Sequence, residues 1–227
     1  MENHVKRTVS CCFSTLRQLR SIWRQVPTAV FQSLVVTLDF SLFDYCNSER
    51  IRLPVNLIRR LQSVQNAAAA RPLFGLHRSG HITDALASLY WLRFPERIVF
   101  KVTVLTYRAV NGSAAVYLSS YFTRVADVLS RMRLRSSTSN QLIVPFYNLT
   151  TVGRRAFPVS AANLWNSLPA QLTSALSLTV FRQRLKTFLF RRSYPDLIIR
   201  HTELTFCCGP SSITLLLRSH WKCRCCW

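Results

Sequence analysis

The chain has 227 residues, 49% of them hydrophobic and 11% aromatic, which is enough apolar material to bury a core and excludes a chain that is disordered over most of its length. Its 30 basic residues against 9 acidic ones give a formal charge of +21, and such a surface favours a polyanionic partner. Four of the basic residues are lysines and the rest are arginines, whose planar fork suits phosphate, although the base composition of the coding DNA is an alternative cause of the excess.

The N-terminal part of the chain begins without an apolar run and cleavage site, so no secretory signal is expected, and residues 1–13 are predicted to be irregular. The helix predicted next ends at Pro27 and has an apolar and a basic side, formed by Leu16, Leu19, Trp23 and Val26 and by Arg17, Arg20 and Arg24. The apolar stripe of residues 30–38 is too short to cross a membrane and is predicted to be core.

The clearest helical pattern lies between Pro54 and the Arg71-Pro72 pair, which indicate its start and its end. Spacings of four, three and four residues place its apolar side chains on one stripe, namely Leu57, Leu61, Val64 and Ala68. Arg59 and Arg60 fall outside that stripe. The pattern therefore predicts a helix with a core side and a basic side.

A short turn follows at residues 75–80. His77 and His81 are four residues apart, as metal ligands on a helix are, but Gly80 lies between them and no second ligand pair follows. We therefore predict no metal site there. Thr83 is expected to cap the next helix, with Asp84 favoured in its first turn.

Residues 96–110 are predicted to form a helix that stops at Asn111-Gly112, although their β-branched content leaves a strand open. Its apolar stripe contains Ile98, Val102, Leu105 and Ala109. Its basic row contains Arg97, Lys101 and Arg108, which either face phosphates or form a solvated surface.

Residues 124–152 are rich in Ser, Thr and Arg and are predicted to connect two helical regions, with a short extended piece near 142–145. Hydroxyls and arginines such as Arg131, Arg133 and Arg135 are common phosphate donors, and a solvated loop is the alternative. Two further helices are expected in residues 153–192, separated by Pro169. The second has a core stripe of Phe181, Leu185, Phe188 and Leu189 opposite a basic side that includes Arg182 and Lys186.

Residues 193–227 form a cysteine-rich tail that we predict to be disordered. Five cysteines and two histidines are enough ligands for a zinc knuckle, but their spacing is poor: His201, Cys207, Cys208, His220, Cys223, Cys225 and Cys226. Unrelated or frame-shifted sequence is the favoured interpretation.

Catalytic chemistry is not indicated anywhere in the chain. Two-metal phosphoryl transfer needs paired carboxylates, and no aspartate here has an acidic neighbour in sequence: Asp39, Asp44, Asp84, Asp127 and Asp196. With 5 glycines the chain also lacks a phosphate-binding loop and a nucleophile elbow. We predict no enzyme activity, no cofactor and no small-molecule substrate.

Short segments spread over about residues 14–192 occur in a characteristic order: Asp44-Tyr45-Cys46-Asn47-Ser48, residues 61–71, His81-Ile82-Thr83, Trp91-Leu92 before Glu96-Arg97-Ile98, residues 107–112, Leu134-Arg135-Ser136-Ser137, Gly153-Arg154-Arg155-Ala156-Phe157, residues 164–169 and residues 181–190. This order resembles the region downstream of the catalytic palm in reverse transcriptases of non-LTR retrotransposons (LINEs) of the jockey-like group. One departure is Arg154, where the family usually has an aspartate.

The resemblance implies a truncated, degenerate piece of an RNA-directed DNA polymerase that lacks the catalytic aspartates. Such a piece is expected to be mainly α, with basic amphipathic helices in one or two small bundles: a thumb-like region at residues 14–123, the connection, and a C-terminal region at residues 153–192. It is expected to bind RNA or RNA–DNA duplex without sequence specificity, inside the cell in nucleus or cytoplasm. The residues predicted to contact nucleic acid are Arg17, Arg20, Arg24, Arg59, Arg60, Arg97, Lys101, Arg108, Arg182 and Lys186.

Two alternatives remain open. One is a transposon-derived reading frame without function, whose product does not fold; cooperative thermal unfolding separates it from a folded binder. The other is a basic protein that acts at a membrane surface or on a host partner through its amphipathic helices.

Overall fold

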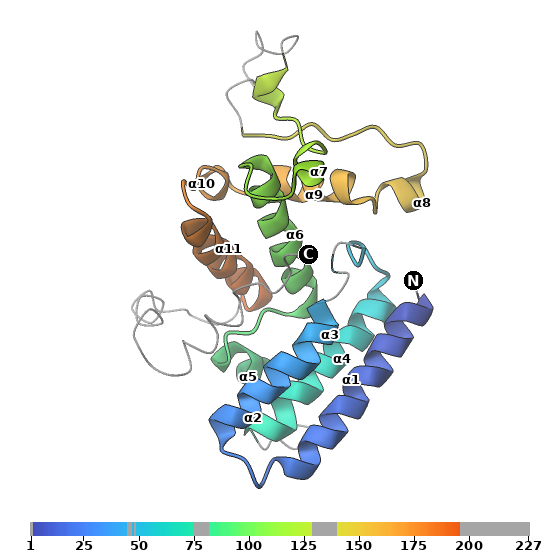
Figure 1. The fold of residues 1–227 in the computed structure, drawn as a ribbon, viewed down its shortest axis with the longest axis vertical. Helices are drawn as coiled ribbons and strands as arrows, with labels where there is room; N and C mark the ends of the chain where they lie inside the picture. The colour runs from blue at the N-terminus through green and yellow to red at the C-terminus, as the bar shows by residue number, and fades with distance from the viewer. Residues whose placement is uncertain (1, 45–46, 48, 75–81, 129–139, 196–227) are drawn as a thin grey trace. The chain divides into compact units, whose positions relative to one another are not determined.

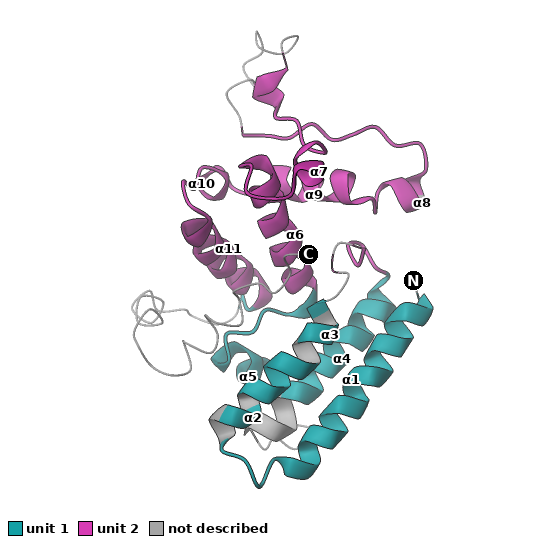
Figure 2. Cartoon of the chain, in the orientation of Figure 1, with its two compact units in different colours: residues 1–45, 54–94, 194–227 teal, residues 46–53, 95–193 magenta. Residues whose placement is uncertain are grey.

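A computed structural model describes residues 2–44, 47, 49–74, 82–128 and 140–195 (Figure 1). As the sequence predicts, this part of the chain is mainly helical, and its only β-bridge joins Arg124 and Leu142. The chain divides into two compact units, shown in Figure 2. Unit 1 contains residues 1–45, 54–94 and 194–227, and unit 2 contains residues 46–53 and 95–193. Residues 196–227 of the cysteine-rich tail and the His77/His81 pair lie outside the described residues. At the start of the predicted tail, Ser193 is helical and Tyr194 is buried, with its hydroxyl donating to the Trp91 carbonyl at 2.7 Å, so the prediction of disorder is wrong there.

Unit 1 is built from three long helical segments. They are α1 (Glu2–Ile22), a continuous run of α2 (Thr28–Leu34), the π-helix η1 (Val35–Asp39) and α3 (Phe40–Asp44), and α4 (Val55–Phe74), followed by the short α5 (Ile82–Ser88). Figure 1 shows α1 and α4 running in the same direction, with the segment of residues 28–44 antiparallel to both. All three contribute buried apolar side chains: Val5, Cys12, Leu16, Leu19, Phe31, Val35, Leu57, Leu61, Val64 and Ala68.

The start of the chain differs from the prediction. Residues 1–13 are not irregular, because α1 begins at Glu2. Val5 and Cys12 lie on the same side of the helix as Leu16 and extend its buried stripe towards the N-terminus. That burial explains why the helix is longer than expected.

Other helix ends and one stripe also need correction. The first helix stops at Ile22, before Trp23 and Val26. Helix α4 continues two residues past Pro72, and α5 begins at Ile82, so that Thr83 is inside the helix and is not its N-cap. In the stripe of residues 30–38, Phe31 and Val35 are buried, whereas Val30 and Leu38 are exposed. The π-helical turn in this segment shifts the side-chain register.

Two amide side chains of α4 fix the backbone between α5 and α6. The buried Gln65 donates from Nε2 to the Leu92 carbonyl at 2.7 Å, and Gln62 accepts through Oε1 from the Phe94 amide at 2.7 Å. Gln62 Nε2 also donates to Asn66 Oδ1 at 2.8 Å, which orients the amide. These bonds hold the segment that leads out of unit 1.

Unit 2 is organised around α6 (Phe94–Val110), whose first residue belongs to unit 1. Buried residues occur on every side of this helix, which is typical of a central core helix. The other elements are α7 (Val116–Ser119), the 3-10 helix η2 (Val125–Asp127), α8 (Thr150–Gly153), α9 (Phe157–Asn166), α10 (Ala170–Thr173) and α11 (Leu178–Ser193).

An aromatic cluster joins three helices of unit 2. Tyr107 of α6 stacks on Phe181 of α11 with ring centroids 4.3 Å apart, and Trp165 of α9 lies 5.8 Å from Phe181. The Tyr107 hydroxyl donates to the Ala175 carbonyl at 2.9 Å, which satisfies the polar end of a buried ring. The predicted stripe is confirmed at Phe181, Leu185 and Leu189, which are fully buried.

Helices α6 and α11 are antiparallel neighbours. Glu96 at the start of α6 lies 4.0 Å from Arg192 near the end of α11, and Tyr107, eleven residues later, meets Phe181, eleven residues earlier. Equal spacings in opposite directions fix this register along about three turns. Helix α6 ends where predicted, at Asn111 and Gly112, and Gly112 has the positive φ of 68° that suits glycine.

The predicted connection at residues 124–152 belongs to unit 2, and the chain passes between the units after residues 45, 53, 94 and 193. The described end of the connection is pinned to α9. The Asn166 side chain accepts from the Leu142 amide and donates to the Leu142 carbonyl, both at 2.8 Å. Trp165 Nε1 donates to the Asn140 carbonyl at 2.7 Å. These side-chain hydrogen bonds fix residues 140–142 against α9, although their sequence resembles a linker.

Candidate nucleic-acid interface

Helix α1 carries an exposed basic strip. Arg17 follows Lys6 by eleven residues, close to three helical turns, so both side chains point the same way, and Arg20 lies one turn further. Ser10 lies between Lys6 and Arg17 on the same side. All four residues are exposed, and the buried stripe of α1 lies on another side of the helix. We call Lys6, Ser10, Arg17 and Arg20 the α1 basic strip; it extends about 21 Å along the helix axis.

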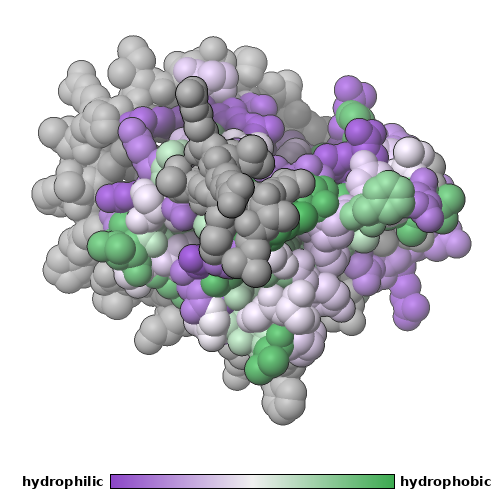
Figure 3. Space-filling model, turned by 90° about the horizontal axis from the view of Figure 1, so that it is seen from above, coloured by the Kyte–Doolittle hydropathy of each residue, from purple (hydrophilic) through white to green (hydrophobic). Residues whose placement is uncertain are grey.

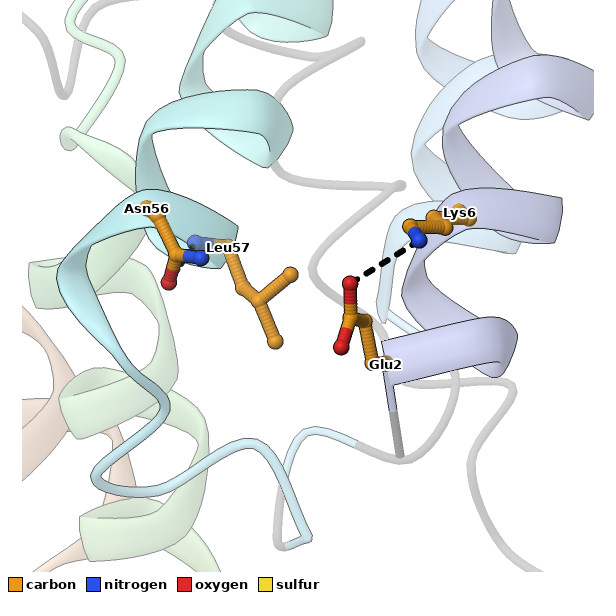
Figure 4. Close-up of polar contacts among 4 residues, drawn as sticks. All are labelled: Glu2, Lys6, Asn56 and Leu57. Atoms are coloured by element: carbon orange, nitrogen blue, oxygen red, sulfur yellow. Dashed lines mark hydrogen bonds and ion pairs between the residues drawn. The ribbon is translucent and has the colours of Figure 1, made fainter.

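The N-terminal end of this strip adjoins α4. Glu2 Oε1 accepts a charged hydrogen bond from Lys6 Nζ at 2.9 Å, and Leu57 of α4 points towards Glu2 (Figure 4). The bond and charge of Lys6 lower the pKa of the Glu2 carboxyl, and the charge of Arg60 lowers it further. Arg60 therefore lies near this end, while Glu2 offsets part of the charge there. The net positive charge is concentrated towards Arg17 and Arg20.

We expect replacement of Lys6 with alanine to raise the pKa of Glu2, measured by carboxyl NMR titration, because the first cause of its lowering is removed. Arg60→Ala should raise it less, and Arg7→Ala, an exposed residue on another side of α1, should leave it unchanged. Since the folded-state pKa is lowered, this contact stabilises the fold above the unfolded pKa and is lost as pH falls through the folded value. A Glu2 pKa that is the same in wild type and Lys6→Ala would contradict the contact.

The remaining predicted residues of unit 1 are exposed but dispersed. Arg59 lies on the side of α4 opposite its buried stripe, about half a turn from Leu57 and Leu61. Arg24 follows the end of α1, and its guanidinium lies 5.5 Å from the centroid of the Trp23 ring. Of the predicted set, Arg17 and Arg20 are thus brought into one strip, to which the structure adds Lys6 and Ser10.

The basic row predicted on α6 is not an exposed row. Arg97 is only 6% exposed, so the prediction that it faces phosphates is wrong, and the reason is that α6 is enclosed on all sides. Lys101 and Arg108 are half-buried, and Arg108 donates from Nη2 to the Ser113 carbonyl at 3.2 Å. Arg124 Nη2 donates to the Val110 carbonyl at 3.1 Å and so satisfies a backbone oxygen at the C-terminal end of α6.

On α11 the predicted basic side also contained Arg191 and Arg192, and only these two of its four cations are exposed. Arg182 and Lys186 are half-buried, whereas Arg184 and Arg191 are exposed and lie seven residues apart, two turns along one side. Sequence reasoning missed Arg184 only, and its seven-residue spacing from Arg191 is visible in the sequence. Arg184 is held by a bond from Nη1 to the Gln171 carbonyl at 3.2 Å.

Comparison of the chain with known protein families, with curated proteins and with solved structures gives no match. Across the described ranges, no three His, Cys, Asp or Glu side chains come together as a metal site would require. Within that same part of the chain, no helix has the length and apolar character needed to cross a bilayer.

Proposed function

We propose that this chain binds RNA or RNA–DNA duplex through the phosphate backbone, without reading sequence and without catalysing a reaction. The observation that carries the proposal is the α1 basic strip. It presents two guanidinium groups, an ammonium group and a hydroxyl on one open side of a helix, and these are common donors to phosphate oxygens. A surface of this kind fixes a backbone in place but offers no set of donors and acceptors for base edges.

The charge of the whole chain supports the same partner. At +21, long-range attraction brings a polyanion to the protein, and the strip gives it a place to bind. The resemblance to the region after the palm of LINE-type reverse transcriptases points the same way, because that region lies along template and primer. We propose that the chain derives from such a region and retains its backbone-binding role.

Replacing Arg17 with glutamate should weaken binding to a 12-base-pair RNA duplex by about tenfold at low salt, since a charged hydrogen bond to phosphate is replaced by repulsion. The measurement is fluorescence anisotropy over a series of salt concentrations. The slope of log affinity against log salt should become shallower by about one, as expected when one phosphate contact is lost.

The matched control is Arg7→Glu, which makes the same charge change at an exposed position on another side of α1. Arg7→Glu should reduce the affinity for the RNA duplex clearly less than Arg17→Glu does. Equal losses in both variants would show that only overall charge matters and would reject the strip as the interface. If the affinity of the wild type for RNA does not change with salt concentration, the proposed function is rejected. If the protein floats with anionic vesicles and does not bind RNA, the membrane-surface alternative is favoured.

A further inference from the structure

Helix α11 of unit 2 presents a second row of hydrogen-bond donors at the surface. Arg184 and Arg191 are both exposed and lie seven residues apart, close to two turns, with Thr187 between them on the same side. Gln183, also exposed, lies one turn before Thr187. The buried stripe of α11 is on another side of the helix. We call Gln183, Arg184, Thr187 and Arg191 the α11 strip; it extends about 12 Å along the helix axis.

The charge of α11 has one sign. The helix contains five cations and no carboxylate: Arg182, Arg184, Lys186, Arg191 and Arg192. Residues 128–195 as a whole contain no acidic residue, and Glu96 of α6 lies 4.0 Å from Arg192, which is outside the strip. Like charges along one helix repel each other, and a polyanion laid along the helix relieves that repulsion.

The needs of the helix itself do not account for Arg184. Arg191 and Arg192 are in the last turn, where the helix dipole favours cations, whereas Arg184 is in the middle of α11. Its guanidinium donates from Nη1 to the Gln171 carbonyl at 3.2 Å. Because a guanidinium group has several N–H donors, this bond holds the group in place and leaves it able to contact a phosphate oxygen.

A broad apolar contact is not favoured as the way in which a partner is held. Among the described residues on the face drawn in Figure 3, hydrophobic side chains occur in small patches bordered by hydrophilic ones. The α11 strip itself offers two guanidinium groups, an amide and a hydroxyl, which are common donors to the phosphates and sugars of nucleic acid. Its chemistry therefore matches that of the α1 basic strip.

We infer that the α11 strip is a second binding surface for the phosphate backbone of RNA or RNA–DNA duplex. Each of the two units then carries a surface of its own, the α1 basic strip in unit 1 and the α11 strip in unit 2. This inference rests on the proposed function, which needs the α1 basic strip alone, and adds a separate site to it. Loss of one strip should weaken binding without abolishing it.

The first test is fluorescence anisotropy with a 12-base-pair RNA duplex over a series of salt concentrations. The double variant Arg184→Gln/Arg191→Gln should lower the affinity about tenfold at low salt. The slope of log affinity against log salt should become shallower by about two, because two phosphate contacts are lost. Arg184→Lys/Arg191→Lys keeps both charges and should leave that slope unchanged.

The matched control is Arg7→Gln/Arg154→Gln, which removes the same charge from exposed arginines on two other elements. It should reduce the affinity clearly less than Arg184→Gln/Arg191→Gln does. Equal losses in these two double variants would overturn the inference, since overall charge alone would then explain them. Equal losses in the glutamine and lysine variants of the α11 strip would also overturn it, because the arginines would then act through something other than charge.

The second test is hydrogen exchange of α11 peptides and does not depend on a variant that folds. Addition of the RNA duplex should slow their exchange in the wild type, and in Arg17→Glu once the duplex is saturating, because the α11 strip binds without the α1 basic strip. Exchange in α11 that is the same with and without RNA would overturn the inference.

Failure of the inference and failure of the proposed function give different results. Wild type that binds RNA, with unchanged affinity in Arg184→Gln/Arg191→Gln, rejects the α11 strip alone. If that variant also no longer floats with anionic vesicles that carry the wild type, the strip belongs to a membrane contact instead. Wild type that binds no RNA duplex rejects the proposed function itself.

Discussion

Replacing Phe181 with alanine is expected to lower the free energy of unfolding of unit 2 by about 3–5 kcal/mol. The ring is fully buried, stacks on Tyr107 and lies beside Trp165, so its removal leaves a cavity where three helices meet. Urea unfolding followed by circular dichroism measures the loss, and hydrogen exchange of peptides from α6, α9 and α11 shows whether it falls in unit 2.

The control is Val180→Ala, at the neighbouring position on the exposed side of α11. It should change the unfolding free energy by much less, because a partly exposed side chain leaves no closed cavity. If both variants lost the same small amount, the aromatic cluster would not be the centre of the unit 2 core. In Phe181→Ala, faster hydrogen exchange should be confined to the helices that meet at Phe181.

A second large loss of stability is expected for Gln65→Leu in unit 1. Leucine has a similar size but cannot donate, so the buried Leu92 carbonyl loses its 2.7 Å bond and remains unsatisfied. Leaving such a group without a partner costs about 1–3 kcal/mol. Urea unfolding measures the cost, and hydrogen exchange in α4 and around residues 91–94 locates it.

Gln18→Leu is the control for this variant, since it makes the same chemical change at an exposed position of α1. Gln18→Leu should leave the free energy of unfolding almost unchanged. A Gln65→Leu protein as stable as wild type would show that apolar burial at this position outweighs the lost hydrogen bond. That outcome would contradict the statement that the Gln65 amide stabilises the backbone between α5 and α6.

Several elements could be predicted because their signals are local. The stripe of Leu57, Leu61 and Val64 repeats with the helical period within one segment. Its burial could be predicted without knowing which other element packs against it. The same holds for Phe181, Leu185 and Leu189. The stop of α6 at Gly112 is a local property as well, because a positive φ favours glycine whatever packs nearby.

The candidate sites were harder to predict. Arg17 and Arg20 are exposed as expected because α1 is covered on one side only, whereas Arg97 is buried because α6 is covered on all sides. Periodicity shows which residues share a side of a helix, but it does not show how many sides will be buried.

The amino-acid sequence by itself determined the helical class, the large positive charge and the apolar stripes, because these depend on residue type and on spacing within one segment. Only the tertiary structure decided which cations remain in solvent, that Asn166 anchors Leu142, and that Gly153 admits the ring of Tyr147. The physical reason is that exposure and close approach are set by atoms from distant parts of the chain, which come together only when the units pack.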